Sequence, residues 1–194
     1  MTMNMKASRK STSPLSQKAL LEWYGRERRA LPWRETSDPY RVWVSEIMLQ
    51  QTRVAAVLEH YRRFLARFPN VQSLANASES DVLASWSGLG YYRRARAMRA
   101  AAQIIVNGMG GEFPRTAAGL SDLPGIGRYT AAAIASIAFG EPVAVVDGNV
   151  ERVLSRFLGR HLRDQKEAWK HAESLLARNR PGDWNQAMME LGAT

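Results

Sequence analysis

The amino-acid sequence predicts an all-α fold. Apolar residues recur at helical spacing through most of the chain, and only one run, EPVAVVD at residues 141–147, has the character of a strand. The chain has 194 residues, of which 45% are hydrophobic. That is enough to bury a sizeable core in one compact domain or in two small lobes.

Helices in the first half of the chain are predicted from apolar periodicity and from capping residues. Pro39 suits the first turn of a helix that includes VWVSEIML. Thr52 is a candidate N-cap for the next helix, which stops before Pro69, and Ser78 with Asp81 forms a capping-box pattern. Further helices are expected at 15–28, at 71–76 and, in a basic stretch ended by Gly108, at 92–107.

The second half of the chain continues the helical pattern. Thr116 is expected to start a short helix, and the glycine turn after it opens an alanine-rich helix that ends at Gly140. The remaining helices are predicted at 148–159, 165–179 and 183–191.

Charge and cysteine content restrict the possible partners. Lys and Arg number 27 against 18 Asp and Glu, a formal charge of +9, which favours an anionic partner such as nucleic acid or a membrane surface, although a protein can also simply be basic. The absence of cysteine excludes disulfides and thiolate metal sites, and His60, His161 and His171 do not have metal-ligand spacing. No metal site is therefore expected.

The N-terminal segment is polar and basic. Residues 1–13 have no apolar run of the kind a signal peptide needs, and we expect a disordered basic tail there. No stretch of the chain approaches the length of a membrane span. We therefore expect no membrane association and a cytoplasmic location, with the protein near the nucleoid if its partner is DNA.

The stretch LPGIGRYTAAAIAS, residues 123–136, contains a glycine turn at the mouth of a helix, where free N–H groups bind anions. Gly125, Gly127 and Asp147, which lies 20 residues further on, nearly match a dinucleotide-binding fingerprint. That motif needs a strand before the first glycine, whereas a helical segment and Pro124 precede it here, and Thr130 replaces the third glycine. A helix-hairpin-helix fits better. Its amides can hold a backbone phosphate and its carbonyls a monovalent cation, although an ordinary turn between helices would look the same.

Two long stretches resemble one family. LPGIGRYTAAAIASIAFGEPVAVVDGNVERVLSR (123–156) resembles the helix-hairpin-helix, Gly-Pro-Asp superfamily of DNA glycosylases, and LPWRETSDPYRVWVSEIMLQQT (31–52) resembles its MutY-type adenine DNA glycosylase branch. The resemblance implies a two-lobe fold. Residues 31–140 would form one lobe, with the hairpin motif near 116–138, and residues 14–30 with 141–194 would form a discontinuous second lobe.

The sequence departs from the family pattern at its end. The family has four cysteines that hold a [4Fe–4S] cluster just after the point where this chain stops at NQAMMELGAT, followed by a domain that reads 8-oxoguanine. With no cysteine, this chain is expected to lack the cluster, its second lobe to be incomplete, and the chain to be a fragment or a truncated product. This departure from the family pattern leaves open which base opposite adenine the protein prefers.

Two carboxylates are candidates for the chemistry. Glu46 lies within the apolar run VWVSEIML, which would favour its neutral form, although on position alone a surface glutamate is the simpler interpretation. Asp147 and Asn149 follow PVAVV and can cap the next helix. The resemblance implies that Glu46 protonates the leaving adenine and then handles the water, that Asp147 stabilises the cationic sugar, and that Asn149 helps to hold the site.

Tyr129 distinguishes two branches of the family. In the related endonuclease III-type enzymes a lysine at the matching position attacks the sugar and cleaves the strand through a Schiff base. Tyr129 has no such amine, so we expect base removal without efficient strand cleavage; simple packing at a helix start is the alternative.

Further residues are assigned by the resemblance, and loop or core packing is the alternative for most of them. The target base has to be flipped out of the duplex. The basic helix YYRRARAMR adds arginines on one face that are expected to contact phosphates, unless that face is merely solvated. The resemblance places four residues around the adenine: Arg29, Trp33, Arg34 and Gln186. It assigns Gln51 and Tyr91 to intercalation, and Leu49 and Thr52 to positions near the opposite base. In the basic helix, Arg93 and Arg96 are the candidates for phosphate contacts.

The function expected from the sequence is removal of adenine, mispaired with 8-oxoguanine or guanine, by hydrolysis of the N-glycosidic bond in base-excision repair. The expected partner is double-stranded DNA with a mispaired adenine, bound by a monomer. Three alternatives stay open: an endonuclease III-type glycosylase and lyase, a non-catalytic helix-hairpin-helix module that only binds DNA, and, least favoured, a nucleotide-binding protein.

Overall fold

The computed structural model describes residues 14–194, with side chains from residue 17 onward, and this part of the chain contains no β-strand. The tail predicted at 1–13 lies outside the described residues. The predicted all-α fold is confirmed. The elements are α1 (Pro14–Glu27), the 3-10 helix η1 (Pro32–Arg34), α2 (Pro39–Leu49), α3 (Val54–Arg67), α4 (Val71–Asn76), α5 (Glu79–Trp86), α6 (Arg93–Met109), α7 (Ala117–Ser121), α8 (Arg128–Phe139), α9 (Gly148–Leu158), α10 (Gln165–Leu175) and α11 (Pro181–Ala193).

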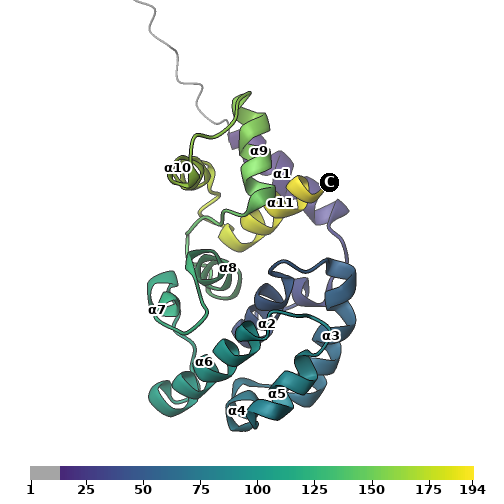
Figure 1. Cartoon of the computed structure of the whole chain (residues 1–194). Helices are drawn as coiled ribbons and strands as arrows, with labels where there is room; N and C mark the ends of the chain where they lie inside the picture. The colour runs from purple at the N-terminus through teal and green to yellow at the C-terminus, as the bar shows by residue number, and fades with distance from the viewer. Residues whose placement is uncertain (1–13) are drawn as a thin grey trace, which may run out of the picture.

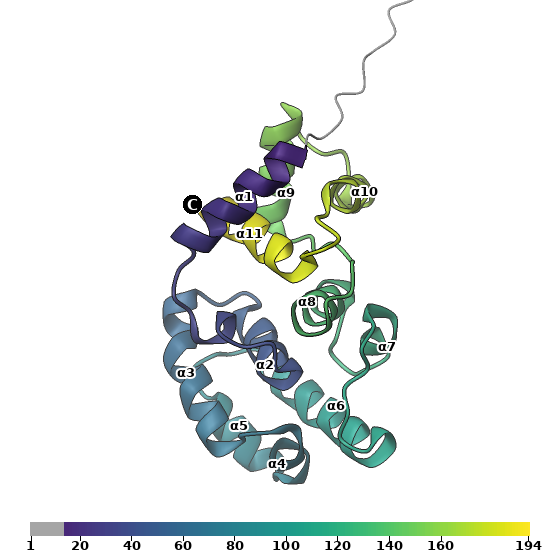
Figure 2. The ribbon, with the colours of Figure 1, turned by 180° about the vertical axis from the view of Figure 1, so that it is seen from behind.

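Two groups of helices bury two hydrophobic clusters. Figure 1 shows α2 to α6 in the lower half of the molecule and α1, α9, α10 and α11 in the upper half. Apolar residues of α2 to α6 form one cluster, and those of α9, α10 and α11, with Leu21 of α1, form the other. Seen from behind, in Figure 2, α1 lies against α11, so residues from the two ends of the described chain pack together.

Helix α8 belongs to both clusters. Ala131, Ile134 and Ala135 face the first cluster, whereas Ala132 and Ala133 face the second. A helix that is buried on all sides has to be apolar all round, and small side chains let its neighbours approach closely. This explains the alanine-rich sequence, and it places α8 between α2 on one side and α11 on the other.

The approach of α11 to α8 is close enough to require glycine. A Cβ built on Gly182 would lie 2.7 Å from the carbonyl oxygen of Ser136 and 2.9 Å from the Cα of Ile137. These are backbone atoms that cannot move aside. Any larger residue at position 182 would therefore push α11 away from α8.

Several predicted helix ends are confirmed by their caps. The Asp38 side chain accepts hydrogen bonds from the amides of Tyr40 and Arg41 at the start of α2, with Pro39 in the first turn. Ser78 and Thr116 cap α5 and α7. Each cap satisfies amides that the first turn of a helix leaves unpaired.

Three local predictions were wrong. Thr52 does not cap α3; its hydroxyl donates to the Gln50 carbonyl, and Arg53 occupies the N-cap without a side-chain bond. Helix α6 continues past Gly108 and ends at Gly110, whose φ of 65° is the left-handed conformation that terminates a helix. The last two helices span 165–175 and 181–193 rather than 165–179 and 183–191.

The strand-like run 141–147 forms no β-strand and pairs with none in the described part of the chain. Side chains satisfy its backbone instead. The Ala144 amide donates to Glu173 Oε1 (3.0 Å) and the Val145 amide to Asn185 Oδ1 (3.1 Å), while Asn185 Nδ2 donates to the Val143 carbonyl (2.9 Å). The run therefore resembled a strand because its apolar residues are buried as in one, although residues 143–145 bond to side chains of α10 and α11.

Candidate active site

A cavity of about 430 Å³ lies where the two groups of helices meet, and we name it the Glu46 cavity after the carboxylic acid in its wall. Every residue predicted from the sequence as catalytic or as adenine-binding lines it, from the loop after α1, from η1, α2, α8 and α11, and from the start of α9. Those eight residues are Arg29, Trp33, Arg34, Glu46, Tyr129, Asp147, Asn149 and Gln186, and Leu49, Gln51 and Thr52 line the same cavity.

Glu46 is held in an apolar environment on α2. Its side chain is only 6% exposed, and neighbours on the same helix are buried hydrophobic residues. Burial raises the pKa of Glu46 to about 7; the negative charge of Asp147 adds to this rise, and the hydrogen bond from Tyr129 and the charge of Arg34 oppose it. A carboxyl group with such a pKa still holds its proton near neutrality, as a general acid must.

The Tyr129 hydroxyl donates to Glu46 Oε2 over 2.9 Å. Burial raises the pKa of Tyr129 well above its usual value, and the neighbouring Glu46 and Asp147 raise it further. The phenol therefore stays protonated. It orients one oxygen of the Glu46 carboxyl group and leaves the other free.

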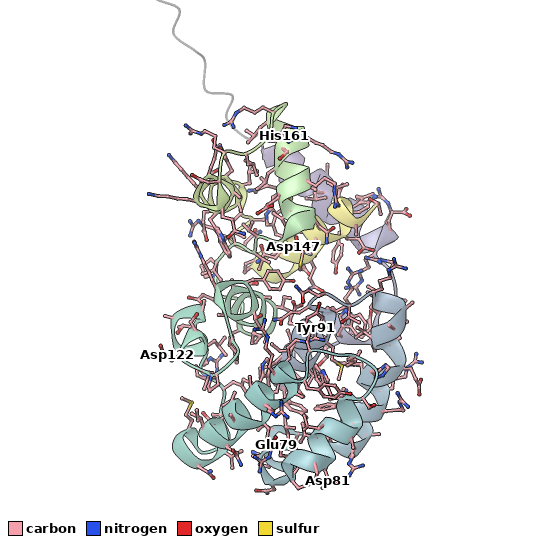
Figure 3. All side chains as sticks on the ribbon, in the orientation of Figure 1. Glu79, Asp81, Tyr91, Asp122, Asp147 and His161 are labelled. Atoms are coloured by element: carbon pink, nitrogen blue, oxygen red, sulfur yellow. The ribbon has the colours of Figure 1, made fainter. Side chains whose placement is uncertain are left out.

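Asp147 begins α9 in the upper half of the molecule (Figure 3). One of its oxygens accepts from the Val150 amide at 2.8 Å, and the other accepts from Asn149 Nδ2 at 2.9 Å. The predicted N-cap at Asp147 is thus confirmed. The cap and the Asn149 amide fix the orientation of the carboxylate at the cavity wall.

Glu190 is a residue that the sequence analysis missed. Its carboxylate is 2% exposed and accepts from Arg29 (2.6 Å) and Arg34 (2.6 Å), so it holds two cavity-lining guanidinium groups in place. Burial alone would raise the pKa of Glu190, but the hydrogen bonds from Arg29 and Arg34 prevail and lower it to about 2. A signal was present, because Glu190 lies four residues after Gln186 and hence on the same face of a helix.

Tyr24 of α1 was also missed. It is buried, and its hydroxyl donates to Gln186 Oε1 at 3.2 Å. The guanidinium of Arg34 lies over its ring, 5.6 Å from the centroid. The hydrogen bond holds the amide oxygen of Gln186, a residue that lines the Glu46 cavity.

A second cavity, of about 960 Å³, adjoins the first, and we name it the Tyr91 cavity. It lies between the end of α2, the start of α6 and the glycine turn before α8. Of the predicted DNA-contacting residues, Gln51, Tyr91, Arg93 and Gly125 line it. Figure 3 shows Tyr91 below Asp147, on the lower group of helices.

Two predicted DNA contacts, Arg96 and Gly127, line neither cavity. Arg96 pairs with Glu79 on α5 at 2.8 Å, and both side chains are about half exposed. Gly127 is the N-cap of α8 and has no side chain to cap it, so the amides of the first turn of α8 have no side-chain acceptor there. The turn packs on α6: Gly125 has φ +76°, and a Cβ on it would lie 2.6 Å from the Cβ of Ala97.

The donor set does not fit an iron–sulfur cluster. The chain contains no cysteine. Among residues 14–194, no group of three or more His, Cys, Asp or Glu side chains is placed to hold a metal ion. No helix in this part of the chain is both long and apolar enough to cross a membrane.

The all-α fold, with a glycine turn joining α7 to α8 and an acid-lined cavity beside it, is that of a helix-hairpin-helix DNA-repair protein. Residues 44–178 match the family model described as HhH-GPD superfamily base excision DNA repair protein. The chain belongs to this superfamily.

Curated relatives and solved structures agree with this assignment. The chain is 50% identical to adenine DNA glycosylase of Rattus norvegicus over 90% of its own length, 48% identical to that of Homo sapiens over 91%, and 40% identical to that of Buchnera aphidicola (strain APS) over 94%. It spans 37%, 35% and 54% of those relatives, respectively. A thermostable thymine-DNA glycosylase superposes with a TM-score of 0.82 at 29% identity, covering 92% of this chain and 85% of that one. An endonuclease III trapped covalently on DNA has the same fold, with a TM-score of 0.76 at 22% identity, covering 89% and 81%.

Proposed function

We propose that the chain is an adenine DNA glycosylase that removes a mispaired adenine from duplex DNA by hydrolysis in base-excision repair. The observation that carries the proposal is the buried Glu46, whose pKa is raised to about 7 so that it can hold a proton near neutrality, in one cavity with the Asp147 carboxylate. Glycoside hydrolysis needs such a pair, one acid neutral and one ionised. The choice of adenine as the base that is removed comes from the relatives, which are named adenine DNA glycosylases.

The reaction proceeds in two steps on these residues. Glu46 donates its proton to a ring nitrogen of the adenine, and the C1′–N bond breaks with its electron pair leaving on the base. The sugar becomes an oxocarbenium ion, which the Asp147 carboxylate stabilises electrostatically. Water then adds to C1′ and gives its proton to Glu46, which restores the acid and leaves an abasic site.

Base recognition is assigned to the wall around these two acids. The buried Trp33 offers an apolar face to a flat purine. The Gln186 amide nitrogen, left free by Tyr24, donates to an acceptor nitrogen of the base. Arg29 and Arg34, held by Glu190, complete the pocket, and Asn149 keeps Asp147 oriented.

DNA is assigned to the Tyr91 cavity and the glycine turn. Gln51 and Tyr91 enter the base stack around the flipped adenine, while Leu49 and Thr52 approach the opposite base. Amides near Gly125 and Gly127 bind one phosphate, with a monovalent cation at the turn carbonyls, and Arg93 binds another.

The assembly proposed is a monomer on duplex DNA, near the nucleoid. Residues 31–140 act as the lobe with the hairpin motif, and 14–30 with 141–194 act as the second lobe. The cavity between them receives the base.

Tyr129 supports hydrolysis over strand cleavage. A lyase needs an amine to form a Schiff base with the sugar, and Tyr129 donates its only proton toward Glu46. We therefore expect no covalent adduct to be trapped by borohydride.

Single-turnover release of adenine from a duplex with adenine opposite 8-oxoguanine, with protein in excess, tests the proposal. We expect release by the wild-type chain and a loss of about 100-fold or more in Glu46→Gln, because the general acid is gone. Glu59→Gln is the matched control, since Glu59 is an exposed acid of α3.

Three outcomes contradict the proposal. If Glu46→Gln releases adenine as fast as the wild-type chain does, Glu46 is not the general acid. A borohydride-trapped adduct indicates a lyase. Duplex binding by a folded wild-type chain without release indicates a module that only binds DNA.

A further inference from the structure

Arg94, at the start of α6, is a buried arginine with no carboxylate partner among the described residues. It is 9% exposed, and its Nε is buried without a hydrogen-bond partner in the same part of the chain. Burial lowers the pKa of Arg94. A buried charge is costly, so its retention calls for an account of what the guanidinium does there.

The guanidinium joins two segments that are more than 35 residues apart in the sequence. Its two terminal nitrogens donate only to backbone carbonyls. Nη1 donates to the carbonyls of Ile47 (2.8 Å), Met48 (3.4 Å) and Gln50 (2.6 Å), and Nη2 donates to those of Leu89 (3.1 Å) and Gly90 (3.3 Å).

Two of these carbonyls directly precede the two strained residues of the structure. Gln51 (φ 57°) and Tyr91 (φ 48°) are the only non-glycine residues with positive φ in residues 14–194. Such backbone is disfavoured for side chains and persists only where its surroundings impose it. The carbonyl of one residue and the amide of the next share a rigid plane. By holding the Gln50 and Gly90 carbonyls, Arg94 fixes the planes from which Gln51 and Tyr91 project.

Aromatic contacts reinforce this arrangement. The guanidinium lies 5.3 Å from the ring centroid of the buried Trp86 and 5.5 Å from that of Tyr91. The Trp86 indole also donates to the Gly90 carbonyl, at 3.0 Å. Tyr91 itself is 56% exposed and lines the Tyr91 cavity together with Gln51. The side chains that project are thus exposed, while the group that holds their backbone is buried.

We propose that Arg94 is a positioning residue that couples Gln51 and Tyr91 into one preorganised pair, so that both enter the base stack together when a base is flipped. The proposal rests on the DNA-binding part of the proposed function and not on the chemistry. Arg94 itself touches no phosphate. It acts on duplex distortion through the two backbone planes that it holds.

The test measures base unstacking rather than base release. The full chain, in a Glu46→Gln background, is titrated onto a duplex with 2-aminopurine opposite guanine at the target position, and fluorescence reports the unstacked base. Arg94→Lys keeps the charge but cannot reach both segments. We expect it to reduce the unstacking equilibrium about tenfold or more, because small misplacements of positioning groups are costly. Arg63→Lys, at an exposed arginine of α3 that lines neither cavity, is the matched control and should retain unstacking.

A second readout separates positioning from charge and from folding. The slope of log affinity against log salt, on undamaged duplex, should be the same in Arg94→Lys and in the parent, because no phosphate contact is lost. Circular dichroism and thermal melting identify a variant that does not fold. In that case Trp86→Phe, which removes the second donor to the Gly90 carbonyl, carries the test and should reduce unstacking in the same direction.

The proposal is overturned if a folded Arg94→Lys chain unstacks the base as the parent does, or if the parent binds the duplex without raising the fluorescence. It is also overturned if the salt slope falls by as much as the loss of a phosphate contact would cause. Because base release is not measured, a failure of the glycosylase proposal leaves this result interpretable.

Discussion

The Glu46 cavity and the Tyr91 cavity share Gln50, Gln51 and Tyr129 in their walls, but different interactions keep them in shape. In the Glu46 cavity, side chains hold side chains: Tyr129 orients Glu46, and Glu190 holds two arginines. In the Tyr91 cavity, a buried arginine holds backbone carbonyls, and the backbone at Gln51 and Tyr91 is strained.

The difference follows from what each cavity is proposed to do. A proton donor has to have a particular pKa, and that is set by burial and by a few charged or hydrogen-bonding neighbours. Distorting a duplex requires side chains that project rigidly, which depends on backbone geometry. Substitutions in the Glu46 cavity should therefore change stability and pH dependence, whereas those in the Tyr91 cavity should change DNA binding.

The largest effect is expected for Glu190→Gln. The substitution leaves Arg34, whose side chain is 8% exposed, and Arg29 without their charge partner. Breaking a buried pair by removing one member costs about 3–5 kcal/mol of unfolding free energy. Urea denaturation measures it. Glu35→Gln, which breaks an exposed pair with Arg28, is the control and should cost no more than about 1 kcal/mol.

The same carboxylate gives stability a pH dependence. The pKa of Glu190 falls from its ordinary 4.5 to about 2 on folding, so its contribution is complete above that ordinary value and is lost as the pH falls toward about 2. In Glu190→Gln this part of the acid dependence should disappear. A variant with unchanged stability and an unchanged acid limb would show that the two arginines are not held by Glu190.

An intermediate effect is expected for Tyr129→Phe. In the proposed mechanism, release of adenine falls as the pH rises through about 7, because Glu46 loses its proton there. The Tyr129 hydrogen bond lowers the pKa of Glu46, so its removal raises that pKa and moves the alkaline limb of the single-turnover rate to higher pH, by up to about one unit. Tyr92→Phe, at an exposed tyrosine, should leave the limb in place. A shift to lower pH would contradict the assignment of Glu46 as the acid.

The smallest effect is expected at the rim of the Tyr91 cavity. Arg93→Gln should reduce the magnitude of the salt slope of duplex binding by about 0.9, the value for one phosphate contact. Arg96→Gln should reduce it less, because Arg96 is paired with Glu79. Fluorescence anisotropy at several salt concentrations measures both. A larger change for Arg96 than for Arg93 would contradict the assignment of a phosphate contact to Arg93.

Much of the fold could be predicted because its signals are local. Caps such as Asp38, Ser78 and Asp147 bond amides two or three residues away, so the pattern and the interaction occupy the same short stretch. The segment 141–147 could not be assigned in this way. Its burial is visible in the residue types, but its partners, Glu173 and Asn185, lie about 30 to 40 residues further along.

The site likewise divides into residues that could be predicted from the sequence and residues that could not. The residues taken from the family resemblance as catalytic and adenine-binding meet in one cavity, although their roles stay a prediction. Glu190, which holds Arg29 and Arg34, and Arg94 were not found from the sequence. Arg94 had a signal, since it lies four residues before the buried Met98 on the apolar face of α6. An arginine in a run of arginines, however, looks like a solvated face.

The sequence by itself determined the all-α class, most helix starts and the glycine turn, because these depend on hydrogen bonds and sterics within a few residues. Only the tertiary structure decided that α8 is buried from both sides, that Glu190 holds two arginines, and that Arg94 is buried while Arg93 and Arg96 are exposed. Each of these depends on which distant segment packs against the residue. Burial then sets the cost of a charge, and through it the pKa of Glu46 and the backbone that Arg94 holds.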